Sequence, residues 1–345
     1  MTRTLCALAA LIAFVGTPTV PFTALAQPVA DFYRGKTISI YVGFPPAGGY
    51  DIYARMMAPY FARHIPGNPT ITIMNMVGGS GVRAASYISN VTAQDGTSLG
   101  LFLDTTTIGK VLGGPGDFDP VKLQWIGRIA STDSVAMVWH TAPAQTVEEA
   151  KRIEIAMAVT QPGTSTSMIA AALNDLVGTK FKLVRGYQGS PGMALAMERG
   201  EVHAMGGMSW DAVKTTKQDW LTGKKARALY TFGMRRLADL PDVPALVDLA
   251  IDDQSRTILS LIGGGAEVGR ALVAEPGTPP ERTAVLRKAF MEAMNDPAFL
   301  ADTKKRNLIV EPLSGSEVQK LIASAVATPA ALVNRAKRYV GGAGK

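Results

Sequence analysis

Glycine, serine and threonine residues gather in short stretches that follow runs of alternating, β-branched residues. The first stretch, residues 45–49, joins a predicted strand at 36–44 to Asp51, which we expect to cap the start of a helix. Pro59, inside that helix, is expected to kink or end it. Backbone N–H groups at such a turn converge on one point and can hold an anion. This stretch alone does not distinguish an anion-binding loop from a plain strand-to-helix turn without a ligand.

The same order of strand, small-residue loop and helix recurs further along the chain. Predicted strands at 70–74 and 98–103 run into the glycine-rich loop 75–81 and the hydroxyl-bearing stretch 104–107. Three consecutive units of this kind imply a parallel sheet with helices on both faces. In such sheets the ligand lies outside the carboxyl ends of the strands, where these loops would gather.

A second series of such units begins after the chain crosses to a new region near 130–140. Its predicted strands, at 153–159, 181–184 and 202–205, lead into further loops rich in glycine, serine and threonine. The predicted architecture is therefore two α/β lobes joined by two crossings, with strand-end loops on both walls of the cleft between them.

The rest of the chain is expected to return to the first lobe. Residues 257–262 form the predicted return, so the lobes would close about crossings at 130–140 and 240–260. Helices predicted at 280–295 and 316–338 then complete the first lobe.

Residues that could catalyse a reaction or bind a metal are sparse. The three histidines, His64, His140 and His203, lie far apart without metal-ligand spacing, and no HExxH or CxxC pattern occurs. Acidic pairs at 148–149 and 252–253 have the context of solvated helix starts or linkers. We therefore predict no catalytic residue, no metal and no cofactor. A protein that is not an enzyme is expected, with an unrecognised active site left open as the alternative.

The composition is that of a folded protein, because 47% of the residues are hydrophobic. The net charge of +7 comes from 35 basic and 28 acidic residues scattered along the chain. Since no run of basic residues occurs, we predict no nucleic-acid-binding surface. The excess of positive charge is in keeping with an anionic ligand.

The N-terminus has the pattern of a secretory signal peptide. Arg3 precedes an apolar run at 5–15, and residues 24–26, Ala-Leu-Ala, offer a cleavage site before Gln27. No later segment has the roughly 18 unbroken apolar residues that a membrane-spanning helix needs. We therefore expect a mature protein in the bacterial periplasm. The predicted division is a signal peptide at 1–26, a first lobe at 27–132 and 255–345, and a second lobe at 133–254.

Five stretches together resemble the substrate-binding proteins of tripartite tricarboxylate transporters, the Bug family. They read GFPPAGGYDIYAR, NMVGGSGVRAASYI, DGTSLG, GYQGSPGMALAMERGEV and LPDVPAL, within a resemblance that covers residues 32–340. It implies a type II periplasmic-binding-protein fold, in which each lobe is a mixed, mainly parallel sheet flanked by helices and the ligand cleft lies between the lobes. It also implies a monomer that captures a small organic carboxylate and delivers it to the permease subunits of such a transporter.

The resemblance also implies which residues grip the carboxylate. In the first lobe these are Phe44, Pro45, Ala47, Gly48, Gly49, Asp51, Gly79, Ser80, Gly81 and Thr105. In the second lobe they are Gly163, Thr164, Ser165, Gly189 and Asp211. Gly48 and Gly49 are expected to supply backbone angles or space that a side chain would deny.

Two departures from the family pattern touch this predicted site. Tyr50 takes the place of a third glycine after Gly48 and Gly49, and residues 186–190 read Gly-Tyr-Gln-Gly-Ser where the usual tract is Tyr-Lys-Gly-Gly. The identity of the carboxylate is therefore not transferred from other members. A protein that presents its ligand to a membrane sensor kinase is the alternative function, because the same binding chemistry would serve both roles.

Overall fold

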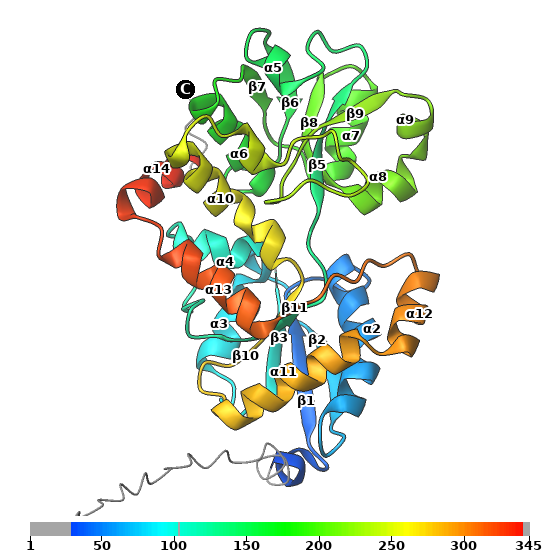
Figure 1. Ribbon diagram of the computed structural model, residues 1–345, viewed down its shortest axis with the longest axis vertical. Coiled ribbons are helices and arrows are strands. Elements are labelled where there is room, and N and C mark those ends of the chain that lie inside the picture. Colours follow the sequence, from blue (N-terminus) through cyan, green and yellow to red (C-terminus); the bar gives the residue numbers. More distant parts are fainter. Residues whose placement is uncertain (1–28, 103, 341–345) are drawn as a thin grey trace, which may run out of the picture.

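Two β-sheets organise the protein, one in each lobe (Figure 1). This computed structural model describes residues 29–102 and 104–340, with the side chains of Ser80, Asp104 and Thr105 outside that description. The predicted signal peptide and its cleavage site also lie outside the described residues. Within the ranges that are described, no helix is long and apolar enough to cross a membrane.

The sheet of the first lobe is mixed. Across the sheet its strands are β11 (Leu313–Ser314), β4 (Gln124–Arg128), β10 (Ala271–Ala274), β3 (Ser98–Leu101), β1 (Thr37–Val42) and β2 (Thr70–Asn75). β1 pairs in parallel with β2 and β3, whereas β10 is antiparallel to β3 and β4. The carboxyl ends of the three parallel strands therefore lie at one edge, which faces the second lobe in Figure 1.

The sheet of the second lobe repeats this order. Across the sheet its strands are β7 (Phe181–Val184), β6 (Ile155–Ala158), β8 (Ala204–Ser209), β5 (Ser134–Trp139) and β9 (Ala226–Thr231). β6 is parallel to β7 and β8, and β5 is antiparallel to β8 and β9. In both sheets the strand that follows a crossing, β10 or β5, is inserted antiparallel beside the third strand. The crossings are thereby brought to the middle of the molecule.

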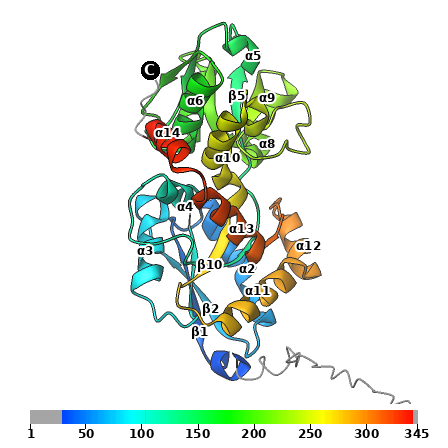
Figure 2. The same cartoon turned by 60° about the vertical axis from the view of Figure 1, so that its left-hand side comes forward.

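Helices flank both sheets (Figures 1 and 2). Those beside the first sheet are α2 (Gly49–His64), the 3₁₀ turn η1 (Gly79–Gly81), α3 (Val82–Asn90), α4 (Asp104–Val111), α11 (Pro280–Met294), α12 (Pro297–Lys305) and α13 (Gly315–Val326). Those beside the second are α5 (Val147–Ala150), α6 (Ser165–Leu176), α7 (Ser190–Glu198), α8 (Trp210–Thr216), α9 (Gln218–Thr222), the 3₁₀ turn η2 (Leu246–Leu249), α10 (Asp253–Val268) and α14 (Ala330–Val340).

Helix α2 does not end at Pro59, which was one of the two effects expected of that proline. It continues through Pro59 to His64, because its buried face, which includes Tyr53, Met57 and Phe61, packs into the core of the first lobe. Each large side chain buried there contributes about 1.5–3 kcal/mol, which together exceed the roughly 3 kcal/mol cost of an internal proline. The prediction that Asp51 caps the helix is wrong, since Gly48 is the N-cap and no side chain caps it.

The second crossing lies later in the chain than predicted. Residues 257–262 belong to α10, and the chain re-enters the first lobe only at Gly269 and Arg270. The N–H of Arg270 bonds the carbonyl of Ala130 at 2.9 Å, so the two crossings run side by side. Gly269 has φ 55°, and a Cβ there would lie 2.3 Å from the Ala130 oxygen. Only glycine fits this close approach.

The C-terminal segment is two helices where one was predicted at 316–338. Pro329 separates α13 from α14, since proline has no N–H with which to continue a helix. Helix α14, in the stretch that we expected to join the first lobe, packs against α6 of the second, as the two views together show (Figures 1 and 2). Its Tyr339 donates a hydrogen bond to Asp175 of α6.

Candidate ligand-binding site

A cavity of about 230 Å³ lies between the lobes, beside the two crossings. Both lobes line it, because Tyr50 of α2 belongs to the first lobe and Ser165, Ser209 and Phe232 belong to the second. The crossings and the neighbouring helices supply the rest of the lining: Thr132, Ser134, Ile169, Ile262, Gly263, Gly265, Ala266 and Arg270. A site shared in this way is complete only when the lobes are held at the right separation.

Arg270 is the sole formally charged side chain among the described residues that line this cavity. Its Nη1 donates to the carbonyl of Ser131 at 2.7 Å, and its guanidinium carbon lies 4.6 Å from the centre of the Tyr53 ring. Its Nε is buried without a hydrogen-bond partner in the described part of the chain. No carboxylate of that part forms an ion pair with it. A guanidinium in this state is suited to an anionic ligand.

Asp51, a predicted ligand residue, holds its own loop from inside. It is 2% exposed, and its carboxylate accepts hydrogen bonds from Ala47 N at 2.9 Å, Arg55 Nε at 2.9 Å and Asn75 Nδ2 at 2.8 Å. The Asn75 amide also donates to the carbonyl of Phe44 at 2.9 Å. The hydrogen bond from Arg55, with those from Asn75 and Ala47, lowers the pKa of Asp51 to about 2 despite its burial. Asp51 therefore fixes the β1–α2 loop and does not line the cavity.

Asp51→Ala is expected to lower the free energy of unfolding by about 3 kcal/mol at neutral pH, because three donors lose a charged acceptor. The folded pKa lies below the unfolded value of 3.8, so this stabilisation is present above about pH 4 and is lost as the pH falls towards 2. Urea denaturation of both proteins from pH 2 to pH 6 measures it. The exposed Asp31→Ala is the matched control, and a wild-type advantage that persists undiminished at pH 2 would contradict the assignment.

The glycines of the β1–α2 loop matter for the room that they leave, not for unusual backbone angles. Gly48 has φ −74° and ψ 162°, an extended conformation open to any residue, so the prediction of glycine-only angles is wrong there. A Cβ on Gly49 would lie 3.9 Å from Nη2 of Arg270, so a larger side chain would occupy space next to the guanidinium. Phe44 stacks on Tyr50 with 4.7 Å between the ring centres and holds that ring at the cavity wall.

In the second lobe, Ser165 is the residue of the predicted 163–165 tract that lines the cavity. It is the first residue of α6. The neighbouring hydroxyls bond one another: Thr164 Oγ1 lies 2.7 Å from Thr160 Oγ1, which is also 2.7 Å from Thr166 Oγ1. Gly163 turns the chain with φ 82°. This cluster therefore fixes the start of α6 and leaves Ser165 to face the cavity.

The other predicted residues do not line this cavity. Gly79 and Gly81 form η1, and Gly189 precedes α7 with φ 79°. Asp211 lines a separate groove of about 620 Å³, which α8 forms with residues 307–310 of the first lobe. The side chains of Ser80 and Thr105 lie outside the described residues. Their roles as ligand contacts stay predictions.

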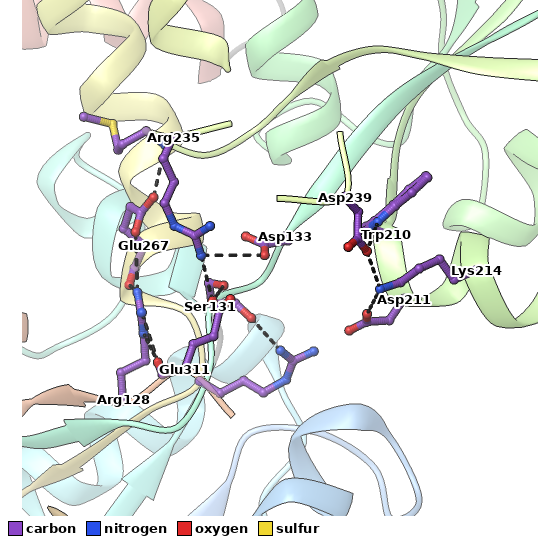
Figure 3. A network of polar contacts seen from close by, with 12 residues as sticks. Arg128, Ser131, Asp133, Trp210, Asp211, Lys214, Arg235, Asp239, Glu267 and Glu311 are labelled. Carbon is purple, nitrogen blue, oxygen red and sulfur yellow. Dashed lines mark hydrogen bonds and ion pairs between the residues drawn. The ribbon is translucent and has the colours of Figure 1, made fainter. Parts of the chain in front are cut away.

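A polar network joins the lobes beside the cavity (Figure 3). Arg128 of β4 donates to the backbone carbonyls of Glu267 at 2.7 Å and Glu311 at 3.0 Å. Arg235, which follows β9 in the second lobe, pairs with the Glu311 carboxylate of the first lobe at 2.7 Å. Ser131 donates to the same carboxylate at 2.8 Å. Through Glu311, the network therefore connects both crossings to a loop of the second lobe.

Sequence reasoning missed Ser134, Ser209 and Arg270. Ser134 is the first residue of β5 and lies inside the predicted crossing region, so its position in the sequence could have identified it as a residue facing the cleft. Ser209 was missed because β8 continues past its predicted end at residue 205 and carries Ser209 to the cleft. No sequence feature marked Arg270 as a cavity residue, since it lies at the second crossing, which was predicted earlier in the chain, at 240–260.

Comparisons with known proteins agree with this architecture. Over residues 54–337 the chain matches the family described as the tripartite tricarboxylate transporter family receptor. It is 26% identical over 342 residues to the UPF0065 protein in gbd 5'region of Cupriavidus necator, which covers 95% of this chain and 94% of that protein.

Two solved structures are similar in fold. One is a TctC solute-binding protein from Polaromonas without ligand, with TM-score 0.69 and 22% identity, covering 88% of this chain and 99% of that chain. The other is MatC from Rhodopseudomonas palustris with bound malate, with TM-score 0.58 and 19% identity, covering 86% and 99%. The expected two-lobed periplasmic-binding-protein fold is thereby confirmed. Since the family match spans most of the chain, the protein belongs to the tripartite tricarboxylate transporter receptor family, the family of solute-binding receptors that the Bug proteins represent.

Proposed function

We propose that the protein is a periplasmic receptor that captures a small organic carboxylate between its lobes. It releases this ligand unchanged to the permease of a tripartite tricarboxylate transporter. The observation that carries the proposal is Arg270, a guanidinium without an acidic partner among the described residues, at the wall of a cavity that both lobes line. The hydroxyls of Ser134, Ser165 and Ser209 supply neutral hydrogen-bonding groups around it. The malate bound to the related MatC supports the same class of ligand.

Closure of the lobes completes the site in this proposal. The cavity walls come from both lobes, so the ligand contacts formed at one wall depend on the distance to the other. The crossings meet at Ala130 and Arg270, and Arg235 spans the lobes beside them to reach Glu311. A ligand that bridges the walls therefore favours the closed arrangement over the open one.

Thermal unfolding of the protein from Gln27 onward, against organic acids and their uncharged amides, tests carboxylate binding. A true ligand at a hundred times its Kd stabilises the folded state by about 2.7 kcal/mol, which raises the midpoint by about 5 °C in a protein of this size. The same acid is expected to reduce the radius of gyration in X-ray scattering. Equal shifts with acid and amide would argue against a carboxylate receptor.

A co-purified ligand would mask such shifts, so the denatured protein is also analysed by mass spectrometry for a released acid. Recovery of the same acid after incubation shows binding without turnover, whereas a chemically altered product would indicate an enzyme. Delivery to a permease is measured separately. A strain without the gene is expected to lose uptake of the acid, and normal uptake would refute the transport role.

A further inference from the structure

We propose that the cavity is matched to a monocarboxylate whose uncharged part is flat and about the size of one ring, with Arg270 as the charge partner. This inference rests on the proposed function and narrows it to one charge class. It follows from three features of the cavity: the free edge of the Arg270 guanidinium, the signs of the surrounding charges, and the size and walls of the space.

The guanidinium of Arg270 presents one free edge. Nη1 donates to the carbonyl of Ser131, and the guanidinium carbon lies over the Tyr53 ring, 4.6 Å from its centre. On the remaining edge, Nε is buried without a hydrogen-bond partner among the described residues, and no hydrogen bond or ion pair between described residues involves Nη2. These two nitrogens point in the same direction and match the two oxygens of a single carboxylate. The small Gly49 keeps the space beside Nη2 open.

The charges around the cavity leave no second cation for a second carboxylate. The other lining residues are neutral, and the acidic side chains near the first crossing, Asp133 and Glu311, already share Arg235 at 4.0 Å and 2.7 Å. Asp133 lies between two lining residues, Thr132 and Ser134. A dianion would bring its second charge out of water towards these carboxylates, with only hydroxyls and amides to replace its hydration.

The size and the walls fit a ring. An apolar cavity of about 150 Å³ accommodates benzene, and this space of about 230 Å³ adds room for one carboxylate. Tyr50 from the first lobe and Phe232 from the second supply aromatic surface, and Ile169 and Ile262 supply aliphatic surface. Aromatic walls favour flat ligands, which pack against them in offset or edge-on arrangements.

Isothermal titration calorimetry with matched acids tests this inference. Benzoate is expected to bind about tenfold more tightly than terephthalate, and hexanoate more tightly than adipate, while benzamide shows no binding. Arg270→Gln is expected to weaken benzoate binding about 30-fold and Arg270→Lys about tenfold, because lysine keeps the charge and loses the two-point contact. Arg256→Gln, an exposed arginine on α10, removes the same charge and is expected to leave binding unchanged.

Circular dichroism and the unfolding midpoint of each variant establish that it is folded before its affinity is compared. Terephthalate or adipate binding as tightly as the monoacid, with affinity that survives Arg270→Gln, would overturn this inference and leave the carboxylate receptor standing. No binding of any mono- or dicarboxylate, with no acid released from the denatured protein, would overturn both.

Discussion

Gly43→Val is expected to lower the free energy of unfolding by about 3 kcal/mol and to abolish ligand binding in the fraction that folds. Gly43 follows β1, and a Cβ on it would lie 2.7 Å from the Cα of Gly81 and 3.2 Å from the Cβ of Phe102. The Gly81 contact is backbone, which cannot rotate away, so η1 and the end of β1 would have to separate. Because the β1–α2 loop carries Tyr50 to the cavity wall, this displacement would reach the site.

Urea denaturation gives the stability of the Gly43 variant, and calorimetry with an acid that binds the wild type gives its affinity. Gly264→Ala is the matched control, because a Cβ there has no atom within 4 Å and the residue lies inside α10. It is expected to stabilise the protein by about 0.5–1 kcal/mol, since alanine favours a helix over glycine. If the Gly43 variant has the same free energy of unfolding as the control, η1 can move away from Gly43 without loss of stability, which would contradict the prediction.

Arg128→Ala is expected to cost about 3–5 kcal/mol of stability, the range for breaking a buried ion pair by removing one partner. Arg128 is 5% exposed, and burial lowers the pKa of its guanidinium. Its nitrogens bond the carbonyls of Glu267 and Glu311, which belong to the end of α10 and to the segment before β11. Without the guanidinium these carbonyls lose its donor groups. The Glu267 carboxylate, 3.5 Å away, loses its cation and keeps the hydrogen bond from Met234 N at 3.1 Å.

Denaturation by guanidinium or heat measures the loss, and Arg34→Ala is the comparison. Arg34 forms an ion pair with Asp31 at 2.9 Å, but its side chain is 67% exposed, so its removal is expected to cost no more than about 0.5 kcal/mol. If the two variants lose the same stability, the Arg128 network is no stronger than a solvated surface pair. A second readout is X-ray scattering without ligand. The distribution of distances within the molecule is expected to broaden, because the network that joins the lobes at the crossings is broken.

Most strands of both sheets were readable from the sequence, because each combines β-branched residues with a following turn. The stretch at 181–184 matches β7 in full, and 70–74 differs from β2 by one residue. The run at 257–262 was misread, because a short apolar run looks the same in a buried strand and in a buried helix. The helix start is marked by Asp252, whose carboxylate accepts from Ser255 N at 2.7 Å; from the sequence, a solvated helix start and a linker were both left open for this acidic pair.

For the site, the sequence predicted where ligand-facing loops would gather but only part of what faces the cavity. Ser165 and the neighbourhood of Tyr50 follow from strand-end loops, which the parallel topology brings to one edge of each sheet. Asp51 was a reasonable ligand from its type, yet its carboxylate is used up by three donors of its own lobe. Whether a polar side chain is satisfied internally depends on neighbours distant in sequence, such as Asn75.

The sequence by itself determined the class of the protein: two α/β lobes, strand-end loops of small residues and the family to which they belong. These properties depend on local periodicity and on glycine-rich turns, which adjacent residues encode. Only the tertiary structure decided which groups share the cavity and which charge is left without a partner. Arg270 lines the same cavity as Ser165 and Ser209 because β10 and β5 are inserted beside the third strand of each sheet. That placement results from pairing between segments that are distant in the sequence, as in the β5–β8 and β3–β10 pairs, which no local pattern records.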